Sequence, residues 1–155
     1  MLSTSFWPRL RVPPRLATEP TGAPTLGPAV DTVGAALFGR PLLAWQSAVS
    51  QVAGEYDPAT GEMLHATVVL HVPRRAGKTA LVLAQLARRV LGQRLSQSWY
   101  TAQTGGDAGT TFRREWLPVL RACGLARKLK VSLRAGAESF ELVTRGASAT
   151  PTLMS

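Results

Sequence analysis

The fold is decided by the stretch TVVLHVPRRAGKT, which runs from Thr67 to Thr79. Its first part, residues 67–72, is a short run of mainly β-branched and apolar residues, and this pattern predicts a buried strand of a parallel sheet. Residues 80–91 then repeat apolar positions at the helical period, and Gly92 ends that pattern. Strand, loop and helix therefore follow one another in the order that phosphate-binding folds require.

The loop between this strand and this helix carries the end of the Walker A pattern, G-x-x-x-x-G-K-[ST]. Gly77 would let the backbone approach a phosphate closely, Lys78 would reach the β- and γ-phosphates of a nucleotide, and the Thr79 hydroxyl would bind Mg²⁺. The helix N-terminus adds partial positive charge. ATP and Mg²⁺ are therefore the expected ligands. Val72 stands where the pattern has its first glycine, so an accidental Gly-Lys-Thr tripeptide in a solvated turn is the alternative.

The rest of the chain predicts further helices and short strands on both sides of this unit. Pro28 suits the first turn of a helix, and Gly39 followed by proline ends it. The run Asp-Pro-Ala-Thr-Gly at residues 57–61 has strong turn chemistry. The predicted elements are helices at 29–38, 42–53 and 107–120 (interrupted near Pro118) and strands at 98–102, 130–133 and 139–143.

These elements place the chain in the α/β class, as a partial P-loop NTPase core with parallel strands and flanking helices. We expect this domain to occupy residues 27–145. A disordered Pro-rich leader is expected over residues 1–26, because its prolines prevent a hydrogen-bonded ladder. The last residues, 146–155, are rich in Ala, Ser and Thr and are expected to be irregular.

Composition excludes several classes of protein. The 155 residues leave no room for a two-domain enzyme, and the single cysteine, Cys123, excludes a disulfide scaffold and any cysteine-based metal site. No stretch approaches the ~18 apolar residues of a membrane span, so no membrane partner is expected. These features predict a cytoplasmic protein.

The net charge of +9 is unevenly placed along the chain. Residues 1–73 carry four Arg and five acids (net −1), whereas residues 74–155 carry eleven Arg, three Lys and four acids (net +10). Such a block attracts the phosphates of a nucleotide or of nucleic acid, although a solvated basic surface explains it equally well. The same two alternatives apply to Arg113, Arg114 and the basic residues of 127–130.

Four segments together resemble a known family. Residues 43–46 (LAWQ), the turn at 57–61, the stretch from 67 to 79 and the residues WYTAQT at 99–104 are similar to the ATPase half of the large terminase subunit of tailed bacteriophages. The resemblance spans residues 27–143, and in that family the first Walker A glycine is commonly absent. It implies a truncated, N-terminal fragment of the ATP-driven motor that packages viral DNA in the host cytoplasm. The implied partners are double-stranded DNA, bound without sequence preference, the terminase small subunit and the portal protein.

The resemblance also assigns roles to individual residues. Arg74, four positions before the lysine, resembles the Walker A arginine that senses or stabilises the γ-phosphate, a catalytic role. Trp45 and Gln46 resemble the segment that contacts adenine, with a core aromatic as the alternative for Trp45. Arg75 and Ala76 lie within the loop that would bind the nucleotide.

The sequence differs from the terminase family in the carboxylates that ATP hydrolysis needs. A Walker B strand of four apolar residues ending in Asp and Glu is absent, since the acids after the loop are Asp107, Glu115, Glu138 and Glu141 and none follows such a run. No acidic cluster for a two-metal nuclease is present either. Enzymatic activity is therefore left open. The alternatives are a catalytically inactive nucleotide- or DNA-binding remnant of a prophage and another P-loop enzyme such as a nucleotide kinase.

Two further pairs of residues have a functional and a structural interpretation. Gln103 and Thr104 sit where such motors couple the nucleotide to DNA, but a helix-capping turn explains them nearly as well. His65 and His71 have no cysteine or carboxylate at ligand spacing, so we expect packed histidines and no metal.

Overall fold

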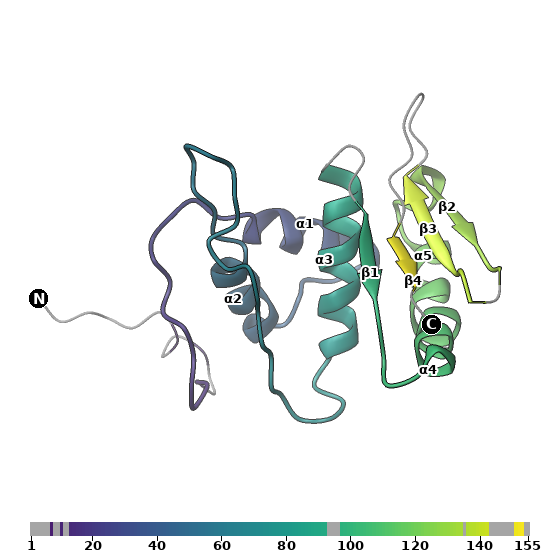
Figure 1. Cartoon of the computed structure of the whole chain (residues 1–155), viewed down its shortest axis with the longest axis horizontal. Helices are drawn as coiled ribbons and strands as arrows, with labels where there is room; N and C mark the ends of the chain where they lie inside the picture. Colours follow the sequence, from purple (N-terminus) through teal and green to yellow (C-terminus); the bar gives the residue numbers. More distant parts are fainter. Residues whose placement is uncertain are drawn as a thin grey trace, which may run out of the picture.

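The helices of the first half begin and end where local sequence signals place them. The computed structural model describes residues 7, 10, 13–92, 97–134, 136–142 and 151–153 (Figure 1). Helix α1 (Gly27–Phe38) has proline in its first turn and ends at Gly39, whose φ of 66° is left-handed. Helix α2 (Ala44–Ala53) begins two residues later than predicted, because Leu43 is its extended N-cap. Both predicted helices are confirmed.

The turn at residues 57–61 is confirmed as well. Tyr56 and Met63 form an isolated antiparallel bridge around it. Gly61 has a φ of 74°, and its N–H donates to the carbonyl of Asp57 at 2.7 Å. This hairpin leads into the extended segment that precedes α3.

Helix α3 (Lys78–Gly92) carries the predicted apolar face into the main core and ends at the predicted glycine. It packs against α1 and lies between α2 and the strands in Figure 1. Its buried residues include Leu83, Ala84 and Val90. The core is completed by α1, by a second helical segment that follows the first strand and by two strands. They contribute Val30, Leu37, Phe112, Trp116, Leu120, Leu129 and Phe140.

The second helical segment consists of α4 (Gly105–Thr111), the π-helical turn η2 (Phe112–Trp116) and α5 (Leu117–Ala122). The interruption predicted near Pro118 is this π turn, in which the N–H of Leu117 donates to the carbonyl of Phe112. Proline has no N–H to continue the α-helical ladder, and a change in hydrogen-bond spacing just before it accommodates that loss.

The sheet is mixed, with the strand order β1-β4-β3-β2. Strand β1 (Ser98–Tyr100) pairs in parallel with β4 (Pro151–Leu153), and β3 (Ser139–Leu142) pairs antiparallel with β4 and β2. Strand β2 (Leu129–Ser132) follows the 3₁₀ turn η3 (Ala126–Lys128). The three strands predicted in this half are confirmed, each somewhat shorter or shifted. Strand β4 lies in the predicted irregular tail, whose other residues, like 143–145, fall outside the described residues.

The strand predicted over residues 67–72 is not formed. The segment is extended but pairs with no strand of the described residues, and Val69 is 89% exposed. His71, which we expected to be packed inside this strand, is exposed. A β-branched run favours extended backbone, but a strand also needs a partner, and β1 is paired with β4 instead. A parallel sheet built on this segment is therefore not seen in the described part of the chain and stays a prediction.

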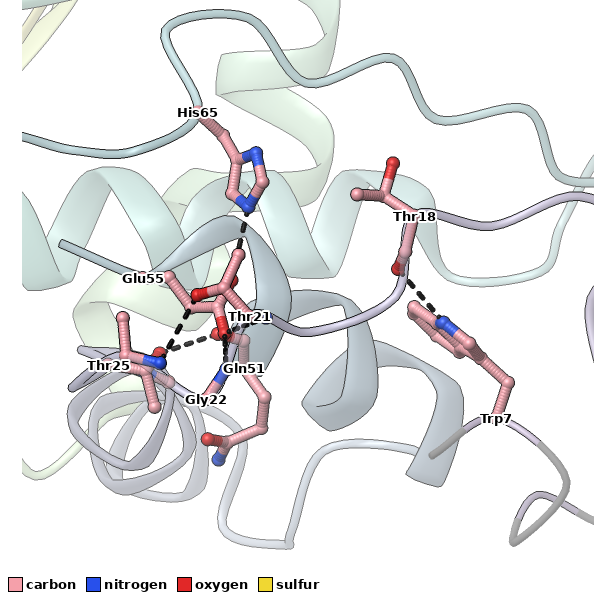
Figure 2. A network of polar contacts seen from close by, with 10 residues as sticks. Trp7, Thr18, Thr21, Gly22, Thr25, Gln51, Glu55 and His65 are labelled. Carbon is pink, nitrogen blue, oxygen red and sulfur yellow. Dashed lines mark hydrogen bonds and ion pairs between the residues drawn. The ribbon is translucent and has the colours of Figure 1, made fainter. Parts of the chain in front are cut away.

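The described residues of the leader, for which the sequence predicts disorder, make specific contacts with the rest of the chain (Figure 2). Trp7 is buried and donates from Nε1 to the carbonyl of Thr18 at 3.0 Å. Glu55, 2% exposed, accepts at Oε1 from the N–H groups of Thr21 (2.8 Å) and Gly22 (3.2 Å). Its Oε2 lies 3.2 Å from Nε2 of His65. One buried carboxylate thus joins the leader to the hairpin that follows α2.

Replacing Glu55 by alanine is expected to lower the free energy of unfolding by about 2 to 4 kcal/mol, because two N–H groups and an imidazole lose their acceptor in a buried place. Urea denaturation measures this change. Glu55→Gln, which keeps one amide oxygen as an acceptor, should cost less than the alanine variant. A loss below about 0.5 kcal/mol in Glu55→Ala would show that the network contributes little.

A second buried carboxylate, Glu138, connects the helical segment to the start of β3. Arg113 donates from Nε to its Oε1 at 2.9 Å, and Nη2 of the same guanidinium forms an ion pair with that oxygen at 2.8 Å. Burial alone would raise the pKa of Glu138, but hydrogen bonds from its own backbone N–H, from Arg113 and from Gly136, with the charge of Arg113, lower the pKa overall.

This shift predicts a pH dependence of stability. The folded chain favours the Glu138 carboxylate more than the unfolded chain does, so its contribution is present above the unfolded pKa of about 4.3 and is lost as pH falls through the folded value. Arg113→Ala should reduce the acid-induced loss and lower stability near neutral pH by about 2 kcal/mol. Denaturation curves between pH 3 and 7 measure both effects. Arg114→Ala, the same charge change on an exposed neighbour, should leave them unchanged.

Candidate functional site

The candidate site is the loop at residues 73–79, which enters α3. Two of its residues have left-handed backbone: Arg75 with a φ of 63° and Gly77 with a φ of 95°. A Cβ at position 77 would lie 2.9 Å from Nε2 of Gln46, so both the backbone angle and the close approach require glycine. The N–H of Ala76 donates to the carbonyl of Pro73 at 3.4 Å, which closes the turn.

Three cationic side chains surround this turn. Arg74, Arg75 and Lys78 are exposed, and within the described ranges none of them forms an ion pair with a carboxylate. Lys78 donates from Nζ to the carbonyl of Val72 at 3.1 Å, which leaves two of its three ammonium hydrogens for another acceptor. The loop therefore concentrates three positive charges that the described protein does not neutralise.

The first N–H groups of α3 have no acceptor. Leu81 is the first residue of this helix whose N–H bonds backward, to the carbonyl of Gly77 at 3.3 Å. The N–H groups of Lys78, Thr79 and Ala80 donate to no acceptor in the described part of the chain. Helix N-termini leave such groups unsatisfied and carry partial positive charge, so this end of α3 suits an anion.

Trp45 and Gln46, at the start of α2, both lie near the loop. Gln46 bonds to the loop directly, whereas Trp45 lines a groove beside it. Gln46 is buried and donates from Nε2 to the carbonyl of Gly77 at 2.8 Å. Trp45 is half-buried and belongs to neither apolar cluster of the described residues. It lines a groove of about 830 Å³ together with Ala76 and residues 67–73. Of the two alternatives for Trp45, an adenine contact and a core aromatic, this placement disfavours the core aromatic.

Thr79 carries the one side-chain oxygen that the loop at residues 73–79 offers to Mg²⁺. Its hydroxyl makes no hydrogen bond to another described residue, so it is available to a metal. Within the described ranges no three His, Cys, Asp or Glu residues gather to hold a metal ion. Mg²⁺ usually keeps several waters and binds through substrate phosphates, so a single hydroxyl fits a Mg²⁺–nucleotide complex and does not fit a free Mg²⁺ ion.

Other sequence-predicted residues serve local structure. Thr104 caps α4: its Oγ1 accepts from the N–H of Asp107 at 3.1 Å and donates to Oδ2 of the same residue at 2.8 Å. Gln103 precedes this cap and is exposed. His65 bonds to the buried Glu55, as a packed histidine does. Arg114 and the charged residues of 127–130 are exposed, so both interpretations of them remain open.

Sequence reasoning missed two features that the structure places at or near the site. Gln46 bonds to a residue 31 positions away in the chain, and no local pattern signals that contact. Glu55 anchors the leader that forms one wall of the groove, and its only sequence signal is an acid beside apolar helix positions. Both depend on how distant segments meet.

Comparison with protein-family models, with curated proteins and with solved structures finds no match to this chain. The resemblance to the terminase family therefore rests on the sequence segments quoted above alone. None of the described helices is long and apolar enough to cross a membrane.

Proposed function

We propose that this chain binds the phosphates of ATP through the loop at residues 73–79. One observation supports the proposal: α3 begins with three N–H groups that have no acceptor among the described residues, and the same stretch of chain carries three cations with no described carboxylate partner. Every helix begins with such N–H groups, and the gathering of three cations without described carboxylate partners beside them is what favours an anion here. An anion held at this point satisfies both at once.

Each residue of the loop has a defined part in this binding. Lys78 turns from the carbonyl of Val72 to the terminal phosphates, and the N–H groups at the start of α3 hold their oxygens. Arg74 places a guanidinium where charge on the γ-phosphate needs balancing. Thr79 completes the coordination of Mg²⁺, which the nucleotide brings with it and which neutralises phosphate charge.

The groove beside Trp45 could hold the adenine base of the nucleotide. Its volume of about 830 Å³ is within the range of small-molecule sites, and it reaches the loop at Ala76. An indole at the wall of an apolar groove stacks well against a purine. The sugar and phosphates would then extend from the groove toward Lys78.

The wider role that we propose is that of an N-terminal part of a terminase motor, with double-stranded DNA, the small subunit and the portal as partners. Its support is the sequence resemblance together with the charge of +10 in residues 74–155. The second candidate is a nucleotide- or DNA-binding module without turnover. The ion pair that engages Glu138 favours it, because one of the few carboxylates after the loop is committed to structure.

Equilibrium titration of the intact chain tests phosphate binding. MgATP and inorganic tripolyphosphate are both expected to bind at one site with dissociation constants of about 0.1 to 1 mM. Adenosine, which has the base but no phosphate, should bind far more weakly. Saturable binding of adenosine with none of tripolyphosphate would contradict the proposal.

A further inference from the structure

We propose that Gln46 is a positioning residue for the phosphate loop, which holds the peptide between Gly77 and Lys78 so that the Lys78 N–H faces the bound phosphate. This inference rests on the proposed function and deepens it. It assigns to Gln46 a task that concerns phosphate, whereas the sequence resemblance implies a contact with adenine.

Both polar atoms of the Gln46 side chain bond to backbone. Oε1 accepts from the N–H of Leu43 at 2.8 Å, and Nε2 donates to the carbonyl of Gly77 at 2.8 Å. Only one orientation of the amide satisfies both partners, because an N–H needs an acceptor and a carbonyl needs a donor. With the side chain 97% buried, given its exposed fraction of 3%, this orientation is fixed.

The bond to Gly77 also fixes the next N–H group. In a trans peptide the carbonyl oxygen of one residue and the N–H of the following residue point in opposite directions. Gln46 holds the Gly77 carbonyl toward α2, so the Lys78 N–H must point away from α2. That N–H has no acceptor among the described residues and belongs to the group that would hold phosphate.

Gly77 is the residue of the loop that most needs such a restraint. Its φ of 95° lies in a region that glycine enters and leaves easily, so the peptide after it can rotate at little cost. Among the described residues the carbonyl receives one other bond, at 3.3 Å from the N–H of Leu81. Gln46 therefore supplies the shorter of the two bonds that hold this peptide.

The geometry disfavours adenine as the primary partner of Gln46. Adenine recognition by an amide uses one donor and one acceptor together, and here both atoms already bond to protein. Trp45, next to it, faces the groove instead. In this proposal Trp45 contacts the base, and Gln46 holds the backbone of the phosphate loop.

The test uses Gln46→Met, which keeps the buried volume but has no donor, and Gln46→Ala as a second variant. Each is titrated with MgATP, MgGTP and tripolyphosphate. The expected result is a loss of about tenfold in affinity that is the same for all three ligands, as removal of one oriented donor implies. Circular dichroism and urea denaturation establish that each variant is folded at the ligand concentrations used.

Gln85→Ala is the matched control, because Gln85 also connects α3 to α2 through its amide, by a 3.3 Å bond to Ser50, but does not contact the loop. It should leave all three affinities within about twofold. An equal loss in this control would assign the effect to helix packing and overturn the inference.

The remaining outcomes are distinguishable. Weakening of MgATP alone, with MgGTP and tripolyphosphate unchanged, would make Gln46 an adenine contact and overturn the inference. Unchanged affinities for all three ligands in both Gln46 variants would overturn it too. Failure of the wild-type chain to bind tripolyphosphate or MgATP would refute the proposed function itself, and this inference with it.

Discussion

A chain in which Lys78 is replaced by alanine is expected to bind no measurable ATP. Lys78 is the first residue of α3, so its ammonium group lies at the end of the helix where phosphate would bind. A charge-assisted hydrogen bond from this group contributes about 1.5 to 3 kcal/mol. Loss of about 3 kcal/mol weakens binding more than 100-fold, which moves a dissociation constant of about 0.1 to 1 mM beyond any practical titration.

The fold should survive this change, because the Lys78 side chain is exposed and its one hydrogen bond within the described residues is to the carbonyl of Val72. Lys128→Ala is the matched control: Lys128 is an exposed lysine of η3, and its removal changes the net charge by the same amount. ATP affinity within about twofold of wild type is expected in the control. Equal losses in both variants would indicate a diffuse basic surface and no specific loop.

The second large effect concerns turnover: we expect the chain to bind ATP without hydrolysing it at a useful rate. Hydrolysis by P-loop proteins needs an aspartate for Mg²⁺ and a group that orients the attacking water, both near the γ-phosphate. After Lys78 the sequence holds four acids, Asp107, Glu115, Glu138 and Glu141.

Two of these four acids bond to other side chains, and a third lies opposite a lysine on the neighbouring strand. Asp107 bonds to Thr104 in the α4 cap, Glu138 is bound by Arg113, and Glu141 pairs in register with Lys130 on the neighbouring strand. Release of inorganic phosphate from ATP measures the prediction. Turnover of about 1 per second or faster, present in wild type and lost in Lys78→Ala, would show that one of these acids acts in catalysis.

Local signals predicted the helices well. Pro28 and Gly39 mark the two ends of α1, and Gly92 ends α3, because backbone restrictions at proline and freedom at glycine act within one turn. The need for glycine at position 77 in the loop at 73–79 was also predicted, because the motif itself contains that glycine. These features depend on neighbours within four residues, which the sequence displays directly.

Pairing was the part that local patterns did not predict. Residues 67–72 have the composition of a buried strand, yet they are unpaired in the described structure and most of them are exposed. The proline-containing β4, predicted to be irregular, pairs with β1 instead. A strand is defined by its partner, and the partner lies far away in sequence. The bond from Gln46 to Gly77 escaped prediction for the same reason.

Phosphate binding at residues 73–79 can be observed residue by residue with backbone amide NMR. In a titration of the ¹⁵N-labelled intact chain with MgADP, the largest shifts are expected at the N–H groups of Gly77, Lys78 and Thr79, with the indole N–H of Trp45 following if the base enters the groove. Shifts centred on the basic residues of 127–130, with the loop unchanged, would contradict the account.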